Sequence, residues 1–242
     1  MSLTTGRGPF SKNPSGQLCR DADGAPAYVE PFPRRVRGVK DGGTVVDSER
    51  VLLVHRQGAP PAYAFPAADV GAGFGTPERL ADGYAAVPWN ELDAWYEEDE
   101  QVFMHPRNPY HRVDCVRTSR RLRVEVAGRV LVDTRQTVGV YETSLPARLY
   151  VARRHLAEGV LSPSDVTTYC PYKGTATYWS AVVGDVEAPD VAFSYEDPYP
   201  GCAAIRGLVC FEPARAQVEQ ELPEAAHWSP GADVAAHRPQ PW

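Results

Sequence analysis

The stretch from Arg120 to Val140, RRLRVEVAGRVLVDTRQTVGV, alternates apolar and charged residues on the N-terminal side of an Ala-Gly turn. In an extended chain, Leu122, Val124 and Val126 point to one side and the charged residues between them point to the other. A period of two that runs into a glycine turn and a second apolar run predicts a β-hairpin with one buried face.

The same pattern occurs 86 residues earlier, in RRVRGVKDGGTVVDSERVLLV, which begins at Arg34. Both stretches read Arg-Arg-apolar-Arg, then a glycine turn, then apolar-Val-Asp-Ser/Thr. Between residues 34–70 and 120–156, eight aligned positions are identical without a gap. We therefore predict an internal duplication.

Further short runs of β-branched and aromatic residues, separated by turn residues, predict an all-β fold made of two tandem β modules. Few short helices are expected, at residues 77–86 and 88–96, since each of these segments begins with a proline. The expected organisation is an N-terminal arm (1–33), a first, degenerate module (34–118), a second module (119–220) and a flexible tail (221–242).

The composition restricts the classes of function. A net charge of −6 argues against a protein that mainly binds nucleic acid. The chain has no apolar run long enough for a membrane span or an export signal, so we expect a cytoplasmic protein. Five cysteines without a CxxC pair predict reduced thiols and no metal site. The sequence indicates no particular cofactor and no oligomeric state.

The segment TTYCPYKGTATYWS, residues 167–180, occurs only in the second copy. It contains Lys173, one of three lysines in a chain with 22 arginines. Pro171 and Gly174 predict a kinked connection between extended segments. In one interpretation, this is a rigid turn whose Cys170 is simply a small buried side chain.

The other interpretation is a ligand site. Lys173 would meet a phosphate or carboxylate, and Tyr172, Tyr178 and Trp179 would form the walls of a small pocket. Arg123, on the polar side of its strand, is a further candidate for binding an anion. The leading hypothesis is thus a small polar or anionic metabolite bound in a pocket of the second module.

Two other classes of function stay open. An enzyme could use the Cys170 thiol or the Lys173 amine as a nucleophile, although the segment contains no histidine to act as a base. Alternatively, the tandem is an interaction scaffold without a small-molecule site.

Three further groups of residues have a structural and a functional interpretation. His105 and His111, near a run of acidic residues, could bind a cation, but a connector between the modules is favoured. Asp47 and Asp133 occupy equivalent places, where they could form an acid pair or, as favoured, cap turns. The repeated arginines, Arg35/Arg121 and Arg37/Arg123, could line an anion groove, but solvated charges on an open sheet face are favoured.

As a whole, the sequence resembles domain-of-unknown-function family 427. The residues that carry the resemblance are VVDSERVLLVH and YAFPAADV in the first copy, HPRNPYHRVD between the copies, and VLVDTRQTVGVYETSLPARLYVARRHL, LSPSDVTTYCPYKGTATYWSA and FSYEDPYPGCAAIRGLVCF in the second. The resemblance implies a strongly bent all-β module of Mss4-like topology, present in tandem, and implies no known reaction.

Members of this family sometimes have a nucleotidyltransferase-like label, which the residues here do not support. That chemistry needs carboxylates that hold magnesium, and the only Asp-x-Asp is Asp21-Ala22-Asp23 in the expected arm. The second copy also departs from the family pattern, because His155 stands where the family has a carboxylate.

Overall fold

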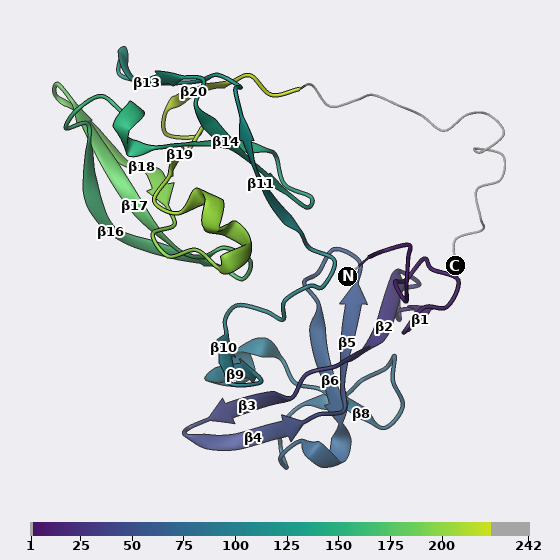
Figure 1. Cartoon of the computed structure of the whole chain (residues 1–242). Coiled ribbons are helices and arrows are strands. Elements are labelled where there is room, and N and C mark those ends of the chain that lie inside the picture. Colours follow the sequence, from purple (N-terminus) through teal and green to yellow (C-terminus); the bar gives the residue numbers. More distant parts are fainter. Residues whose placement is uncertain (1, 224–242) are drawn as a thin grey trace. The chain divides into compact units, whose positions relative to one another are not determined.

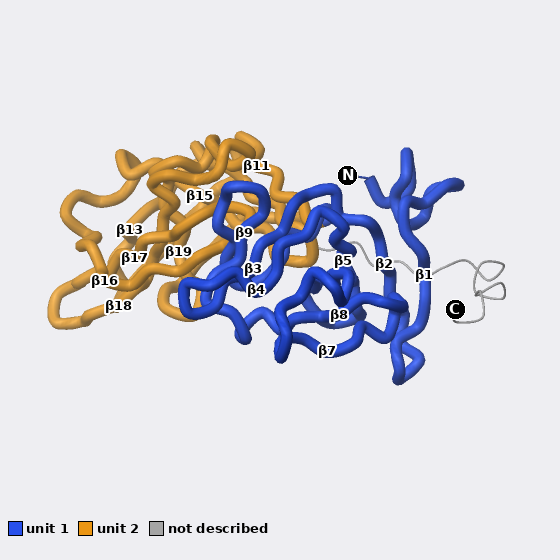
Figure 2. Tube along the Cα trace, turned by 90° about the horizontal axis from the view of Figure 1, so that it is seen from below, with its two compact units in different colours: residues 1–110, 228–242 blue, residues 111–227 orange. Residues whose placement is uncertain are grey.

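The computed structural model describes residues 2–223, and the chain divides into two compact units between Tyr110 and His111 (Figure 2). Both units are built from antiparallel β-sheets, so the predicted all-β class is confirmed. In the described residues 2–223, the helical segments are all short 3-10 turns. No helix in this range is long and apolar enough to cross a membrane.

The described part of the first unit contains ten strands and two 3-10 turns (Figure 1). Its two sheets have the strand orders β1-β2-β5-β6-β8-β7 and β10-β9-β3-β4. The elements are β1 (Gln17–Arg20), β2 (Pro26–Phe32), β3 (Val36–Lys40), β4 (Gly43–Ser48), β5 (Val51–Arg56), β6 (Ala62–Pro66), η1 (Ala67–Asp69), β7 (Thr76–Pro77), β8 (Tyr84–Ala86), η2 (Trp89–Glu91), β9 (Ala94–Glu97) and β10 (Glu100–Val102).

The second unit also has two sheets, with the strand orders β11-β14-β15-β19-β18-β17-β16 and β13-β12-β20 (Figure 1). Its elements are β11 (Val113–Thr118), β12 (Leu122–Val126), β13 (Arg129–Thr134), β14 (Thr137–Glu142), β15 (Arg148–Val151), η3 (Arg153–His155), β16 (Leu161–Cys170), β17 (Gly174–Val183), β18 (Val186–Ser194), η4 (Pro200–Ile205), β19 (Val209–Phe211) and β20 (Gln217–Gln220).

The two units share one pattern of strand pairing. Strands β3 to β5 and turn η1 begin and end at the positions of β12 to β14 and η3, shifted by 86 residues, and β15 begins at the position of β6 but ends one residue earlier. The registers of β2–β5, β3–β4 and β5–β6 recur at the same shift in β11–β14, β12–β13 and β14–β15, and a bulge in β3 recurs in β12. The units differ most between the 3-10 turn and the next core strand, where the second unit contains β16, β17 and β18.

Local residue chemistry explains the repeated hairpin. Asp41 and Gly42 turn the chain from β3 into β4 with positive φ angles, as Ala127 and Gly128 do from β12 into β13. Two consecutive positive φ angles match the right-handed twist of the flanking strands. The alternation in β12 is observed as well, since its apolar residues are buried and its charged residues are half-buried.

Two expectations for the first unit are wrong. Residues 1–33 do not form a separate arm, because β2 pairs with β5 along its length inside the larger sheet. Residues 77–86 and 88–96 are not helices, since β8 and β9 there pair with β6 and β3. Pairing with strands distant in sequence, together with burial of Trp95 at 2% exposure, overrides the local helical spacing. Of the expected tail 221–242, residues 224–242 lie outside the described residues.

The second unit has two apolar clusters. One packs the small sheet against part of the large sheet, with Leu122, Val124 and Leu131 among its members. The other lies beneath the Cys-Pro-Tyr-Lys-Gly turn and combines aromatic residues with cysteines. Its buried members are Val140, Tyr150, Ala176, Phe193, Tyr195, Cys202, Ile205 and Cys210.

Candidate functional site

The turn between β16 and β17 presents the lysine that the sequence singled out. Cys170 ends β16 and pairs with Gly174, the first residue of β17. The Lys173 amide donates to the Cys170 carbonyl at 3.3 Å, and the Lys173 carbonyl accepts from the Tyr199 amide at 3.1 Å. Gly174 has a φ of +101°, a conformation that side chains disfavour. The segment is therefore a turn anchored by backbone hydrogen bonds.

Lys173 is buried, with 9% of its surface exposed. Its ammonium group forms an ion pair with the Glu142 carboxylate on β14, and it lies 5.9 Å from the centroid of the Tyr195 ring. Lysine is rarely buried unless it is paired, and the contacts here combine a carboxylate with an aromatic face. Glu142 compensates the buried charge.

His111 completes this cluster. Its Nε2 lies 2.9 Å from Oε1 of Glu142, so the carboxylate bridges the histidine and the lysine. The imidazole stacks on the Tyr172 ring with 3.9 Å between centroids and 16° between planes. His111 thus belongs to the polar cluster around Glu142, and it also lies in the segment between β10 and β11 that the sequence predicted as a connector.

Glu142 carries the negative charge of the cluster. Burial alone would raise its pKa, but hydrogen bonds from Lys173 and His111 outweigh burial and hold the pKa of this carboxyl below its ordinary value of 4.5. The folded protein therefore holds Glu142 ionised at a pH where the unfolded chain begins to bind a proton.

This shift predicts a pH dependence. A lowered carboxyl pKa stabilises the fold above the unfolded-state pKa, and this stabilisation is lost as pH falls through the folded-state pKa. We expect the gap in unfolding free energy between the parent and Glu142→Gln to be constant above about pH 5.5 and to shrink on acidification. Urea unfolding at a series of pH values measures it. A gap that widens in acid would contradict the assigned sign.

A cavity of about 220 Å³ lies beside the ion pair. Its charged lining comes from Glu142, Arg148 and Lys173, and the rest of its lining is mostly apolar. Arg148 also donates to the Phe211 carbonyl at 3.3 Å, which helps to fix its guanidinium. The full lining is Val140, Glu142, Leu145, Pro146, Arg148, Tyr150, Lys173 and Phe193.

Of the three aromatic residues predicted as pocket walls, Tyr172 stacks on His111, and the other two face different surroundings. Tyr178 packs in the aromatic cluster, with its ring 5.7 Å from that of Phe193, which lines the cavity. Trp179 lies on the other face of β17, where its Nε1 donates to Oγ of Ser194 at 2.8 Å. Its ring is covered by the Arg153 guanidinium at 3.9 Å. Trp179 is thus held in a separate hydrogen-bonded group.

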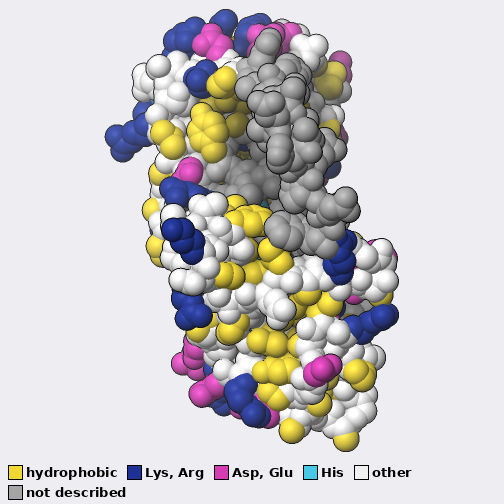
Figure 3. Space-filling model, turned by 90° about the vertical axis from the view of Figure 1, so that its right-hand side faces the viewer, with side chains coloured by type: hydrophobic (Ala, Val, Ile, Leu, Met, Phe, Trp, Pro, Cys, Tyr) yellow, Lys and Arg dark blue, Asp and Glu magenta, His cyan; other side chains and the backbone are white. Residues whose placement is uncertain are grey.

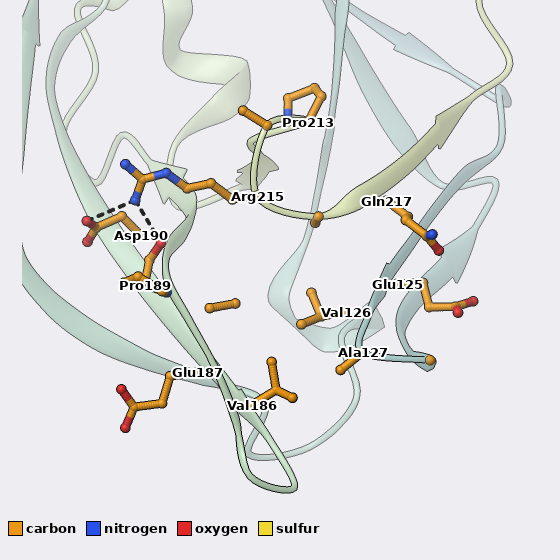
Figure 4. Close-up of a pocket in the computed structure, with 14 residues that line it drawn as sticks. Glu125, Val126, Ala127, Val186, Glu187, Pro189, Asp190, Pro213, Arg215 and Gln217 are labelled. Atoms are coloured by element: carbon orange, nitrogen blue, oxygen red, sulfur yellow. Dashed lines mark hydrogen bonds and ion pairs between the residues drawn. The ribbon is translucent and has the colours of Figure 1, made fainter.

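Arg123 does not line the cavity beside Lys173. It pairs with Glu125 at 2.7 Å, and Glu125 lines a different groove of about 850 Å³ between the β12–β13 turn, β18 and the segment before β20 (Figure 4). In this groove, Arg215 is bound to the carboxylate of Asp190 and the carbonyl of Pro189 (Figure 4). Several of its charges are already paired, so this groove is a weaker candidate for an ionic ligand.

The repeated Arg and Asp residues pair with each other. Arg35 binds Asp47 through two hydrogen bonds of 2.7 and 2.5 Å, and Arg121 binds Asp133 with the same two distances. The aspartates are therefore neither turn caps nor an acid pair, because each holds two strands of a hairpin together through a forked arginine contact.

Three cysteines of the second unit, Cys115, Cys202 and Cys210, favour the thiol form. Burial raises the pKa of Cys202 to about 12 and that of Cys210 to about 12. Burial likewise raises the pKa of Cys115. Cys170 is half-buried and packs against the same cluster. In residues 2–223, no group of three or more His, Cys, Asp or Glu side chains is arranged to hold a metal ion.

Position 155 holds a histidine where a carboxylate was expected, and the first unit shows which contacts such a carboxylate makes. The residue equivalent to His155 is Asp69, which accepts hydrogen bonds from Ser48 at 2.7 Å and Arg50 at 2.8 Å. The Nε2 atom of His155 is buried and has no hydrogen-bond partner within the described chain. In the first unit this carboxylate therefore holds η1 to the β4–β5 turn.

Glu142 and Arg148 were not predicted from the sequence. Both belong to the strand pair β14–β15, and Glu142 precedes Lys173 by 31 residues, so no local motif links them. Their equivalents in the first unit, Arg56 and Ala62, differ in charge or size. Glu142 and Arg148 could therefore have been found by comparing the two copies at matched positions of the sequence.

Comparisons with known proteins agree with this division of the chain. Residues 114–222 match the model of a family described as a domain of unknown function, DUF427. This range covers almost all of the second unit from β11 to β20. No curated protein matches the chain.

Proposed function

We propose that the second unit, whose residues 114–222 match the DUF427 family model, binds a small organic anion in the cavity beside Lys173. The observation that carries the proposal is the buried Lys173–Glu142 pair at the edge of this cavity. Buried ion pairs often contribute little net stability, so their presence beside an open space favours a role in recognition.

The charges of the cavity favour an anion. Among the lining residues, Lys173 and Arg148 supply two cations, and Glu142 supplies one carboxylate that already binds Lys173 and His111. Arg148 also contacts Glu212, which is not a lining residue, at a longer distance of 3.5 Å. An arginine can bind a carboxylate through two parallel hydrogen bonds. The ligand carboxylate would therefore lie against Arg148, with Lys173 nearby.

The size and the apolar wall of the cavity narrow the ligand further. A volume of about 220 Å³ is smaller than the roughly 300–1,000 Å³ of pockets for drug-sized ligands. Tyr150 and Phe193 supply aromatic surface to the lining, with the Arg148 guanidinium 6.0 Å from the centroid of the Phe193 ring. A compact carboxylate with an apolar or aromatic part fits both features.

A covalent enzyme is less well supported. The amine of Lys173 would have to lose its proton to act as a nucleophile, whereas the Glu142 contact stabilises the ammonium form. His111, the histidine of this cluster, is engaged by Glu142 and Tyr172. Neither arrangement favours activation of Lys173 or Cys170.

We also propose that the first unit is a diverged copy of the same domain that lacks this site. The shared registers support common descent, and the first unit has no counterpart of the β16–β17 turn. A cytoplasmic location is part of the proposal, supported by five free cysteines.

A variant at the cavity mouth tests the proposal without removing a buried charge. Leu145 lines the cavity with 56% of its surface exposed, so Leu145→Trp should obstruct entry at little cost to the fold. We expect benzoate to raise the melting temperature of the parent more than its neutral isostere benzamide, and Leu145→Trp to lose most of this response.

The matched control is Val182→Trp, a substitution of similar size at a residue 55% exposed on β17. It should respond to benzoate as the parent does. Acetate and succinate extend the series to carboxylates without an aromatic part. The proposal fails if no carboxylate stabilises the parent, or if Leu145→Trp responds as strongly as Val182→Trp.

A further inference from the structure

A second cavity of the second unit is bordered by arginines. It has a volume of about 690 Å³ and lies where β11, the β13–β14 turn, η3 and η4 come together. Arg117, Arg135 and Arg154 line it, and none of its lining residues is acidic. Cationic groups without interspersed carboxylates create a positive potential that attracts anions.

Two of these arginines are free to bind a ligand. Within residues 2–223, Arg117 and Arg154 form no ion pair, whereas Arg135 is held by Glu221 at 2.6 and 2.8 Å. Most other arginines of the second unit are paired, as Arg121 is with Asp133. The groove therefore gathers guanidinium groups whose charge the described chain leaves largely uncompensated.

The first unit serves as an internal reference. Shifted by 86 residues, the positions of Arg117, Arg135 and Arg154 are Pro31, Glu49 and Ala68. The backbone registers of the surrounding strands are the same in both units. The arginines are thus not required by the shared fold, in contrast to the Arg–Asp pairs that both units contain.

The remaining lining adds hydroxyl and apolar groups. Thr118 and Thr137 lie beside the arginines, and Val138, Tyr150 and Leu208 form an apolar floor. Arginine forks bind phosphate oxygens through paired hydrogen bonds, and an apolar floor favours an organic group attached to the phosphate.

We propose that this arginine groove binds a small organic phosphate ester. Tyr150 is the one lining residue that the groove shares with the cavity beside Lys173. The phosphate lies between Arg117 and Arg154, and the organic part lies over Tyr150 and Leu208. Glu221 competes for Arg135, so its carboxylate lowers the affinity of the groove. The net charge of −6 disfavours a nucleic acid. Figure 3 shows one face of the molecule, on whose described part basic and acidic side chains are interspersed among hydrophobic ones.

Calorimetric titration of the full chain with phenyl phosphate tests this site. We expect Arg117→Ala and Arg154→Ala each to weaken binding by about tenfold, the effect of losing one charge-assisted hydrogen bond. Glu221→Gln should strengthen binding, because it removes the competing carboxylate from Arg135. Inorganic phosphate should bind more weakly than phenyl phosphate, and neutral benzyl alcohol more weakly still.

The control is Arg129→Ala, which removes an exposed arginine on β13 outside the groove. It should bind phenyl phosphate as the parent does, and so should Leu145→Trp, which keeps this test independent of the other cavity. The inference is overturned if Arg129→Ala weakens binding as much as Arg154→Ala. The inference is also overturned if benzyl alcohol or inorganic phosphate binds with the same affinity as phenyl phosphate. Binding of single-stranded RNA without binding of phenyl phosphate would overturn it as well.

Discussion

Replacing Glu142 with glutamine is expected to lower the unfolding free energy of the second unit by about 3–5 kcal/mol. The substitution keeps the size of the side chain but leaves the ammonium of Lys173 buried without a counter-charge. Lys173→Met should cost less, because the remaining carboxylate keeps its contact with His111 at 2.9 Å. Hydrogen exchange of the β14 and β17 amides measures both losses within this unit.

The double variant Glu142→Gln with Lys173→Met tests whether both single substitutions destabilise the unit by removing the same ion pair. If the ion pair is the interaction removed, Glu142→Gln with Lys173→Met should be more stable than the sum of the single losses predicts, by about 0.5–3 kcal/mol. Strict additivity would mean that the two side chains act separately. A double variant as stable as the parent would mean that the ion pair adds little net stability, which agrees with its proposed role in ligand recognition.

Local patterns predicted the parts of the fold that local chemistry determines. The alternation in β12 and the turn at Ala127-Gly128 depend on neighbouring residues, and both are observed. Trp95 was misassigned because its environment comes from β3, which precedes β9 by more than fifty residues. Helical spacing is a weak signal where a segment is completed by pairing with a distant strand.

The candidate site shows the same limit. The scarcity of lysine drew attention to Lys173, and the structure buries this residue in a polar cluster. Its partner Glu142 lies on β14, four positions away from β17 in the sheet order, so the two residues are neighbours neither in sequence nor in strand pairing. Trp179 was grouped with Lys173 by proximity in sequence, yet alternate residues of a strand face opposite sides.

Phe193→Ala is expected to cost the second unit about 3–5 kcal/mol, as is usual when a buried phenylalanine is truncated. The ring is 8% exposed and meets Tyr150 and Tyr195 edge-on, with centroids 6.0 and 6.1 Å apart. Phe193→Leu should cost less because it retains most of the apolar surface. Hydrogen exchange of β18 measures these losses.

Phe193→Ala also tests whether the apolar lining of the cavity beside Lys173 is rigid. If Phe193 holds the cavity open between Tyr150 and the charged groups, its removal leaves a space that an aromatic molecule can fill. Benzene should then stabilise Phe193→Ala in proportion to its occupancy and leave the parent unchanged. If benzene stabilised the parent and Phe193→Ala equally, it would bind at a site other than the space left by the Phe193 ring. A loss below about 1 kcal/mol would mean that neighbouring side chains collapse into the space and that the wall is not preformed.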